Sequence, residues 1–155
     1  GIFRKNLEES GMSFNNEVDM ISKANGKGLL TVCYVFTPEE ARLMAIAGAD
    51  IIVVHFGLTL GGSIGALTTL DLEDCTGIVD KCAKAAQDIN PDIFILCHGG
   101  PVAMASDAEF VIQRAKICHG FLGASSMERL PTEIAIARTA REFKAIRTTT
   151  QKVNP

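Results

Sequence analysis

The chain has 155 residues, of which 47% are hydrophobic and 21% charged, and its formal net charge is −3. This composition indicates one globular domain with a hydrophobic core and excludes a disordered chain. The basic residues form no extended stripe, so we expect no nucleic-acid partner. Apolar runs stay well below the ~20 residues that span a membrane, and the first residues lack the apolar stretch of a signal peptide.

The number of cysteines is odd, and none of them belongs to a Cys-x-x-Cys pair. This pattern argues against a zinc ribbon, a redox dithiol or a secreted disulfide framework. We therefore predict reduced, buried thiols in a cytoplasmic protein. The five cysteines are Cys33, Cys75, Cys82, Cys97 and Cys118.

The first predicted elements are a helix over residues 14–24 and a strand within the apolar, β-branched run 29–36. Thr37 and Glu40 have the spacing of a capping box, which predicts the start of a second helix. We expect this helix to end at Gly48, because glycine readily takes the left-handed conformation that terminates helices.

The middle of the chain repeats the same order of elements. A strand is predicted from residue 51 to His55, followed by a glycine-rich loop over 57–70. Apolar residues spaced by three and four positions then predict a helix over 71–89. The next strand covers residues 93–97.

The last third adds two helices and a weaker strand. A capping box at residues 106–109 predicts a helix to about residue 116, and the strand follows at 117–122. Residues 125–128 form a third capping-box candidate before a final helix that Pro131 introduces. Residues 148–155 are expected to be an unstructured tail.

Four successive strand–helix units predict an α/β fold with a parallel sheet. Doubly wound and barrel arrangements both fit this order. A complete (β/α)8 barrel needs about 250 residues, so residues 1–147 accommodate about half of one. Half a barrel exposes its sheet edges and its apolar inner face. We therefore expect association with another half or with further copies, as a homo-oligomer.

Several short motifs occur in one order along the chain: Phe3-Arg4, Tyr34-Val35-Phe36, Ala47-Gly48-Ala49-Asp50, His55-Phe56-Gly57-Leu58-Thr59, His98-Gly99-Gly100-Pro101 and His119-Gly120-Phe121. With these motifs the chain resembles the phosphoenolpyruvate hydrolase-like TIM-barrel family over residues 2–144. The same domain forms the C-terminal part of a plant protein that inhibits tobamovirus multiplication. The resemblance implies a (β/α)8 barrel whose last four strands are those found here, with the first four expected upstream.

His55 and His98 each follow a predicted strand. Ligands bind at the carboxyl ends of parallel strands, and imidazole is suited to proton transfer near neutral pH. We therefore predict catalytic roles for both histidines, with Glu128 as a carboxylate partner. A metal site would need a further ligand such as Glu8 or Glu128. No spacing fixes one, so no metal ligand is assigned and the cofactor stays open, a divalent metal being the lesser alternative.

Two turns of small residues predict an anion site at the same end of the sheet. Small residues let backbone N–H groups approach a phosphate, and a following helix adds its positive end. The alternative for the second turn is a plain helix cap by Ser125. The loop over 57–70 is either a mobile lid or a second anion nest. The predicted ligand-binding residues are Arg4, Gly99, Gly100, Gly123, Ser125 and Ser126.

Together these features favour a TIM-barrel lyase or hydrolase, phosphoenolpyruvate hydrolase-like, that acts on a small phosphorylated or carboxylated metabolite. The alternative is a non-catalytic regulatory or assembly domain that keeps the ligand pocket of the barrel. The alternative has weight because half a barrel carries only half of the strand ends that build such a site.

Overall fold

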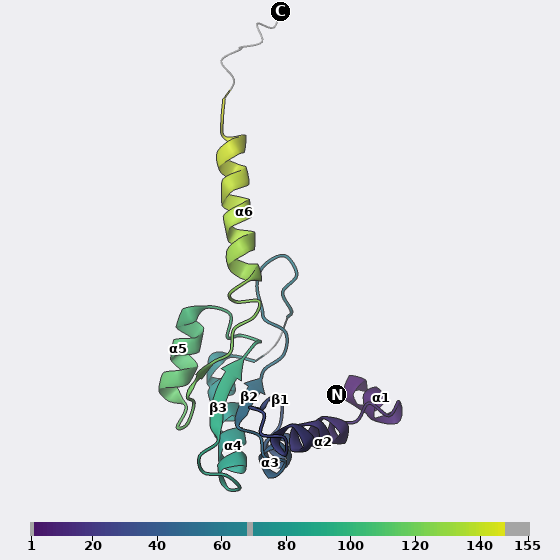
Figure 1. Ribbon diagram of the computed structural model, residues 1–155. Coiled ribbons are helices and arrows are strands. Elements are labelled where there is room, and N and C mark those ends of the chain that lie inside the picture. Colours follow the sequence, from purple (N-terminus) through teal and green to yellow (C-terminus); the bar gives the residue numbers. More distant parts are fainter. Residues whose placement is uncertain (1, 68–69, 148–155) are drawn as a thin grey trace, which may run out of the picture.

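The computed structural model describes residues 2–67 and 70–147, without the side chains of residues 2–4. The predicted tail 148–155 lies outside the described residues. The elements in chain order are α1 (Ile2–Glu9), α2 (Phe14–Asn25), β1 (Val32–Val35), α3 (Pro38–Ile46), β2 (Ile51–His55), α4 (Leu72–Gln87), β3 (Phe94–His98), α5 (Ala105–Arg114), β4 (Gly120–Phe121) and α6 (Arg129–Lys144) (Figure 1).

The four strands form one parallel sheet in the order β1-β2-β3-β4. In a doubly wound fold the strand order reverses and helices cover both faces. Here the order never reverses, and the core between sheet and helices lies on one face only. This is the winding of a (β/α)8 barrel. The fold is therefore four parallel β/α units, the arrangement of half a TIM barrel.

The face that α3, α4 and α5 cover forms the hydrophobic core. Side chains alternate between the two faces of a strand, so every second residue of β1, β2 and β3 points into this core. Each of these residues is at most 7% exposed. They are Cys33, Val35, Ile52, Val54, Ile95 and Cys97.

The predicted burial of the thiols holds for four of the five cysteines, whereas Cys118 is only partly buried; all five are free in this structure. Burial is the main reason that the pKa of Cys33 and of Cys82 rises to about 12. A hydrogen bond with Cys118, together with burial, raises the pKa of Cys97 as well. Cys97 therefore stays protonated on the covered face, away from the face that carries His98.

The opposite face of the sheet is largely open, as expected for half a barrel. Its outer positions are exposed: Val32 by 46%, Tyr34 by 42% and Phe94 by 56%. Val53 is an exception, because it lies between its register partners Tyr34 and Leu96 and is fully buried.

The cap predicted for the helix after β1 is confirmed. Thr37 Oγ1 accepts a hydrogen bond of 3.2 Å from the Glu40 N–H, and the Glu40 carboxylate accepts one of 2.7 Å from the Phe36 N–H. Pro38 is the first residue of α3, where its missing N–H costs nothing. Gly48 has a φ of +85° just after α3, as predicted.

Two predicted caps are wrong. Asp107, not Ser106, closes the start of α5, because its carboxylate accepts from the N–H groups of Ala103 and Met104 at 3.1 and 2.7 Å. At α6, residues 125–128 form a turn instead of a capping box. The Ser125 carbonyl accepts from the N–H groups at positions 129 and 130, so the helix begins at Arg129.

The ends of the molecule differ from the sequence-based expectation. Helix α1 was not predicted, and the strands expected over 29–36 and 117–122 shorten to β1 and to the two residues of β4. Helix α6 extends away from the body of the molecule (Figure 1), and beyond Leu130 most of its residues are exposed. Among the described residues no helix is long and apolar enough to cross a membrane.

Candidate functional site

The structure brings His55 and His98 side by side at the carboxyl ends of β2 and β3. The two residues are register partners, and their ring centroids are 4.7 Å apart with the planes inclined by 69°. The Tyr34 ring contacts both imidazoles, with centroid distances of 4.9 and 5.2 Å. Phe36 adds a fourth ring, 4.9 Å from His55. These four residues form a ring cluster on the open face of the sheet.

His55 is half-buried, and a backbone amide holds its ring. The Gly57 N–H donates a 2.9 Å hydrogen bond to His55 Nδ1. Burial and the neighbouring charge of His98 lower the pKa of His55 to about 4, from an ordinary 6.5. His55 is therefore neutral at physiological pH.

His98 is 8% exposed, and its backbone partner is the residue that follows β4. Its Nδ1 lies 2.7 Å from the carbonyl oxygen of Leu122. A carbonyl can only accept a hydrogen bond, so this nitrogen carries a hydrogen. The Leu122 N–H in turn donates to the Cys97 carbonyl at 3.0 Å, which fixes the position of the accepting carbonyl.

Gly99 and Gly100 let the end of β3 lie against residues 56–57. Their φ values are +76° and +54°, and a Cβ on Gly99 would come within 2.4 Å of the Gly57 carbonyl oxygen. The Gly100 N–H donates to that oxygen at 2.9 Å. The amide of Gly100 is therefore engaged within the protein, and the two glycines position the loop that holds His55.

The predicted Gly123–Ser126 turn makes different contacts. A Cβ on Gly123 would come within 3 Å of the exposed Met127 side chain, which would have to shift to make room for it. Ser126 lines a cavity of about 470 Å³ between α5 and the turn, together with Met104, Phe121 and other mostly apolar side chains. Ser125 and Ser126 are half-buried, near the carboxyl end of β4.

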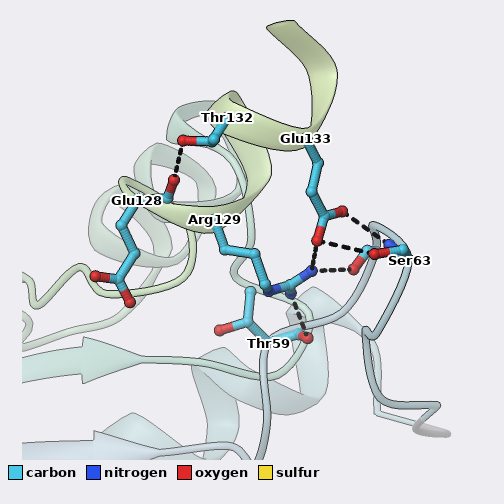
Figure 2. Close-up of polar contacts among 7 residues, drawn as sticks. Thr59, Ser63, Glu128, Arg129, Thr132 and Glu133 are labelled. Atoms are coloured by element: carbon cyan, nitrogen blue, oxygen red, sulfur yellow. Dashed lines mark hydrogen bonds and ion pairs between the residues drawn. The ribbon is translucent and has the colours of Figure 1, made fainter. Parts of the chain in front are cut away.

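Glu128 is not brought to the histidines. It is exposed at the N-cap of α6, where its carboxylate points away from the neighbouring Arg129–Glu133 pair (Figure 2). Glu8 instead accepts a 3.0 Å hydrogen bond from the Phe14 N–H. Arg4 lies in α1, but its side chain is outside the described part. Within residues 2–67 and 70–147 no three His, Cys, Asp or Glu side chains gather closely enough to hold a metal ion.

His119 binds backbone groups of the neighbouring strand β3 and so has a structural role. Its Nδ1 accepts a 2.9 Å hydrogen bond from the Ile95 N–H, and its backbone N–H donates to the Ile95 carbonyl at 2.7 Å. Its ring contacts Phe94, with 5.3 Å between the centroids. It lies at the start of β4, away from the carboxyl ends of the strands.

A clamp between the loop over 57–70 and α6 was not predicted from the sequence. Glu133 accepts hydrogen bonds from the Ser63 N–H at 2.8 Å and the Ser63 hydroxyl at 3.1 Å, and it pairs with Arg129 at 3.2 Å (Figure 2). Arg129 also donates to the Gly61 carbonyl at 3.0 Å. The pair is only 17% and 27% exposed. The loop is thus held to α6 in this structure by the loop clamp, Ser63, Arg129 and Glu133.

The fold and the ring cluster define half of a (β/α)8 barrel with aromatic and imidazole side chains at its strand ends. The chain belongs to the phosphoenolpyruvate hydrolase-like family, whose model matches residues 1–146.

Among proteins of known sequence, the chain is similar to the ToMV susceptible protein tm-1(GCR26) and the ToMV resistance protein Tm-1(GCR237) of Solanum lycopersicum. Each is 53% identical over 146 residues, which are 94% of this chain and 19% of the tomato protein. A putative transcriptional regulatory protein, y4pA of Sinorhizobium fredii, is 28% identical over 153 residues, 99% of this chain and 25% of that protein. The chain thus spans about a fifth of the tomato relatives.

Two solved structures are similar to part of this chain. A mutant of FabK from Thermotoga maritima has a TM-score of 0.46 at 21% identity, over 67% of this chain and 30% of that one. Nitroalkane oxidase from Streptomyces ansochromogenes also has a TM-score of 0.46, at 23% identity, over 71% of this chain and 31% of the oxidase.

Proposed function

We propose that this chain forms the carboxyl-terminal half of a TIM-barrel enzyme that acts on a small phosphorylated or carboxylated metabolite by lyase or hydrolase chemistry. The observation that carries the proposal is the pair His55–His98, two imidazoles 4.7 Å apart at the strand ends. Membership of the phosphoenolpyruvate hydrolase-like family supports the reaction class. The remaining strand ends would come from the other half of the barrel.

The two histidines have different parts in this proposal. His55 is neutral near pH 7 because its pKa is about 4, so it acts as a hydrogen-bonding group. His98 is the group that takes up and returns the proton. Backbone amides and hydroxyls near Ser125 and Ser126 hold the anionic group, with Arg4 as a further candidate.

The test uses the full-length protein that contains this chain and phosphoenolpyruvate as the first probe. We expect phosphate release that falls by about 100-fold or more in His98→Gln, the usual scale for a lost acid–base group. Glu142→Gln, on the exposed part of α6, is the matched control and should keep full activity. Unchanged turnover in His98→Gln would contradict the proposed role of the pair.

A second candidate function is a non-catalytic ligand-binding regulatory or assembly domain. The open sheet face favours it, since Val32, Tyr34 and Phe94 are about half exposed. The relatives support it too, because their names describe virus susceptibility, virus resistance and transcriptional regulation.

We therefore expect residues 1–155 to associate, as a homo-oligomer or with another half-barrel, at micromolar concentration. Phe94→Lys should shift the sedimentation profile towards the monomer by placing a charge on the open face. A single monomeric species of the unchanged chain in sedimentation, with cooperative unfolding, would contradict the assembly proposal. Rapid turnover of a metabolite by this chain alone would exclude the non-catalytic one.

A further inference from the structure

We infer that the backbone holds His55 and His98 in opposite tautomers, so that the pair receives a carbonyl compound with an ionisable C–H next to the carbonyl group. His55 presents an N–H and His98 presents a lone pair, each at Nε2. The inference rests on the proposed function, in that it names the substrate class of the same site. Phosphoenolpyruvate itself has no such C–H, whereas pyruvate, the product of its hydrolysis, has one. It also makes the two histidines different, because one ring donates a hydrogen bond and the other accepts a proton.

The tautomer of His55 follows from the donor that it faces. The Gly57 N–H can only donate, so His55 Nδ1 must accept, and the hydrogen of the neutral ring lies on Nε2. Gly57 is itself held, because its carbonyl accepts from the Gly100 N–H at 2.9 Å. The loop therefore keeps the amide in place.

The tautomer of His98 is the reverse. Leu122 offers a carbonyl oxygen, which can only accept, so the hydrogen of the neutral His98 ring lies on Nδ1. Its Nε2 is then a free base. No buried side-chain nitrogen or oxygen of the described residues lacks a partner. Because Nε2 of His98 has no hydrogen-bond partner among these residues, it is not completely buried, although the residue as a whole is only 8% exposed.

These two groups match a proton abstraction next to a carbonyl. His98 Nε2 takes the proton, the electron pair of the broken C–H bond forms the C=C bond of an enolate, and the carbonyl π electrons move onto oxygen. The Nε2–H of His55 donates a hydrogen bond to that oxygen and keeps its proton. A neutral imidazole with a lowered pKa polarises a substrate carbonyl in this way in other TIM-barrel chemistry. Return of the proton from His98 completes the step, so no co-reactant is needed.

The first measurement is the assignment of ring tautomers by 15N NMR on the intact chain, which requires no turnover. We expect His55 to carry its hydrogen on Nε2 and His98 on Nδ1. His119 is the internal reference, because the Ile95 N–H donates to its Nδ1 and fixes the same tautomer as in His55. The same tautomer in His55 and His98, or rapid averaging between the two forms in either ring, overturns the inference.

The second measurement tests the ligand class with acetohydroxamic acid, a stable compound whose carbonyl oxygen can accept a hydrogen bond from His55 and whose ionisable O–H can donate one to His98. We expect it to perturb Nε2 of both histidines and to bind at least about tenfold more tightly than its O-methyl derivative, which has lost that proton. His98→Gln should remove the difference. Equal binding of the two compounds, or binding of neither, overturns the substrate class.

These outcomes remain separate from the test of the proposed function. Opposite tautomers and selective binding of acetohydroxamic acid without any turnover would leave the inference about the pair intact and remove the enzymatic proposal. Phosphate release that depends on His98, with both histidines in the same tautomer, would support the enzymatic proposal and overturn the inference.

Discussion

The two faces of the sheet carry different tasks. On the covered face, Val35, Ile52 and Ile95 are fully buried beneath the helices. On the open face, Tyr34 and Phe94 are about half exposed, and the ring cluster lies at the strand ends. Adjacent residues of one strand therefore serve stability and the candidate chemistry in turn. The comparison teaches that the two can be changed separately, and four predictions test this.

The largest expected effect separates neighbouring residues of β3. Ile95→Ala removes a fully buried side chain and should cost about 2–5 kcal/mol of unfolding free energy. Phe94→Ala, one residue earlier and 56% exposed, should cost about 1 kcal/mol or less. Urea unfolding of both variants measures the difference. Similar costs would mean that the open face is covered in solution, which would sharpen the case for assembly.

The next effect concerns Gly99, in the turn after β3, which lies against the loop that holds His55. Gly99→Ala would force a residue with a side chain to a φ of +76° and bring its Cβ to 2.4 Å from the Gly57 carbonyl oxygen. We expect a loss of about 1–3 kcal/mol and a disturbed His55 ring. Gly77→Ala in α4 is the matched control. Its Cβ would meet nothing within 4 Å, so it should stabilise the helix by about 0.5–1 kcal/mol.

A smaller effect appears in the pH dependence of stability. His55 has a pKa of about 4 in the folded protein against an ordinary 6.5, so the unfolded chain binds more protons between these values. Stability should therefore decrease as the pH falls from about 6.5 to about 4, and then level off for this group. His55→Gln should lack this part of the pH profile in thermal unfolding. NMR titration should place the midpoint of His55 near pH 4, and a midpoint near 6.5 would show that the ring is solvated.

The smallest effect is local to the loop clamp. Hydrogen bonds from Ser63, together with Arg129, hold the pKa of the Glu133 carboxyl below its ordinary value. Glu133→Gln should speed hydrogen exchange at the Ser63 amide without changing the global unfolding midpoint much. Glu142→Gln breaks the exposed Arg138–Glu142 pair, 74% and 67% exposed, and should change neither. Equal exchange in both variants would mean that the loop is held by its glycine contacts alone.

Local patterns were enough to predict much of the fold. The four strand–helix units, the Thr37 cap and the end of α3 at Gly48 all depend on neighbours within a few residues. The pairing of His55 with His98 could also be anticipated, because parallel strands bring their carboxyl ends together. The caps predicted at Ser106 and Ser125 were wrong because several residues near each helix start can accept a hydrogen bond from a backbone N–H. Tertiary contacts decide which of them does so.

Other features had no local signal. The loop clamp joins residues 70 positions apart, and nothing in the sequence around Ser63 points to Glu133. The hydrogen-bond partners of the histidine ring nitrogens could not be predicted either, since they are backbone groups of Gly57 and Leu122. Tyr34 was part of a recognised motif, but its contact with both imidazoles depends on β1 lying next to β2.

Through the register of β2 against β3, the buried residues of the covered face determine how the two histidines are paired. His55 is opposite His98 only because Ile52 is opposite Ile95 and Val54 is opposite Cys97. A slip of one residue would turn both the imidazole of His98 and the apolar side chains beside it to the wrong face. Errors in strand pairing during folding are thus penalised by lost burial before any ligand arrives. The relative position of His55 and His98 therefore depends on buried residues that do not contact a substrate.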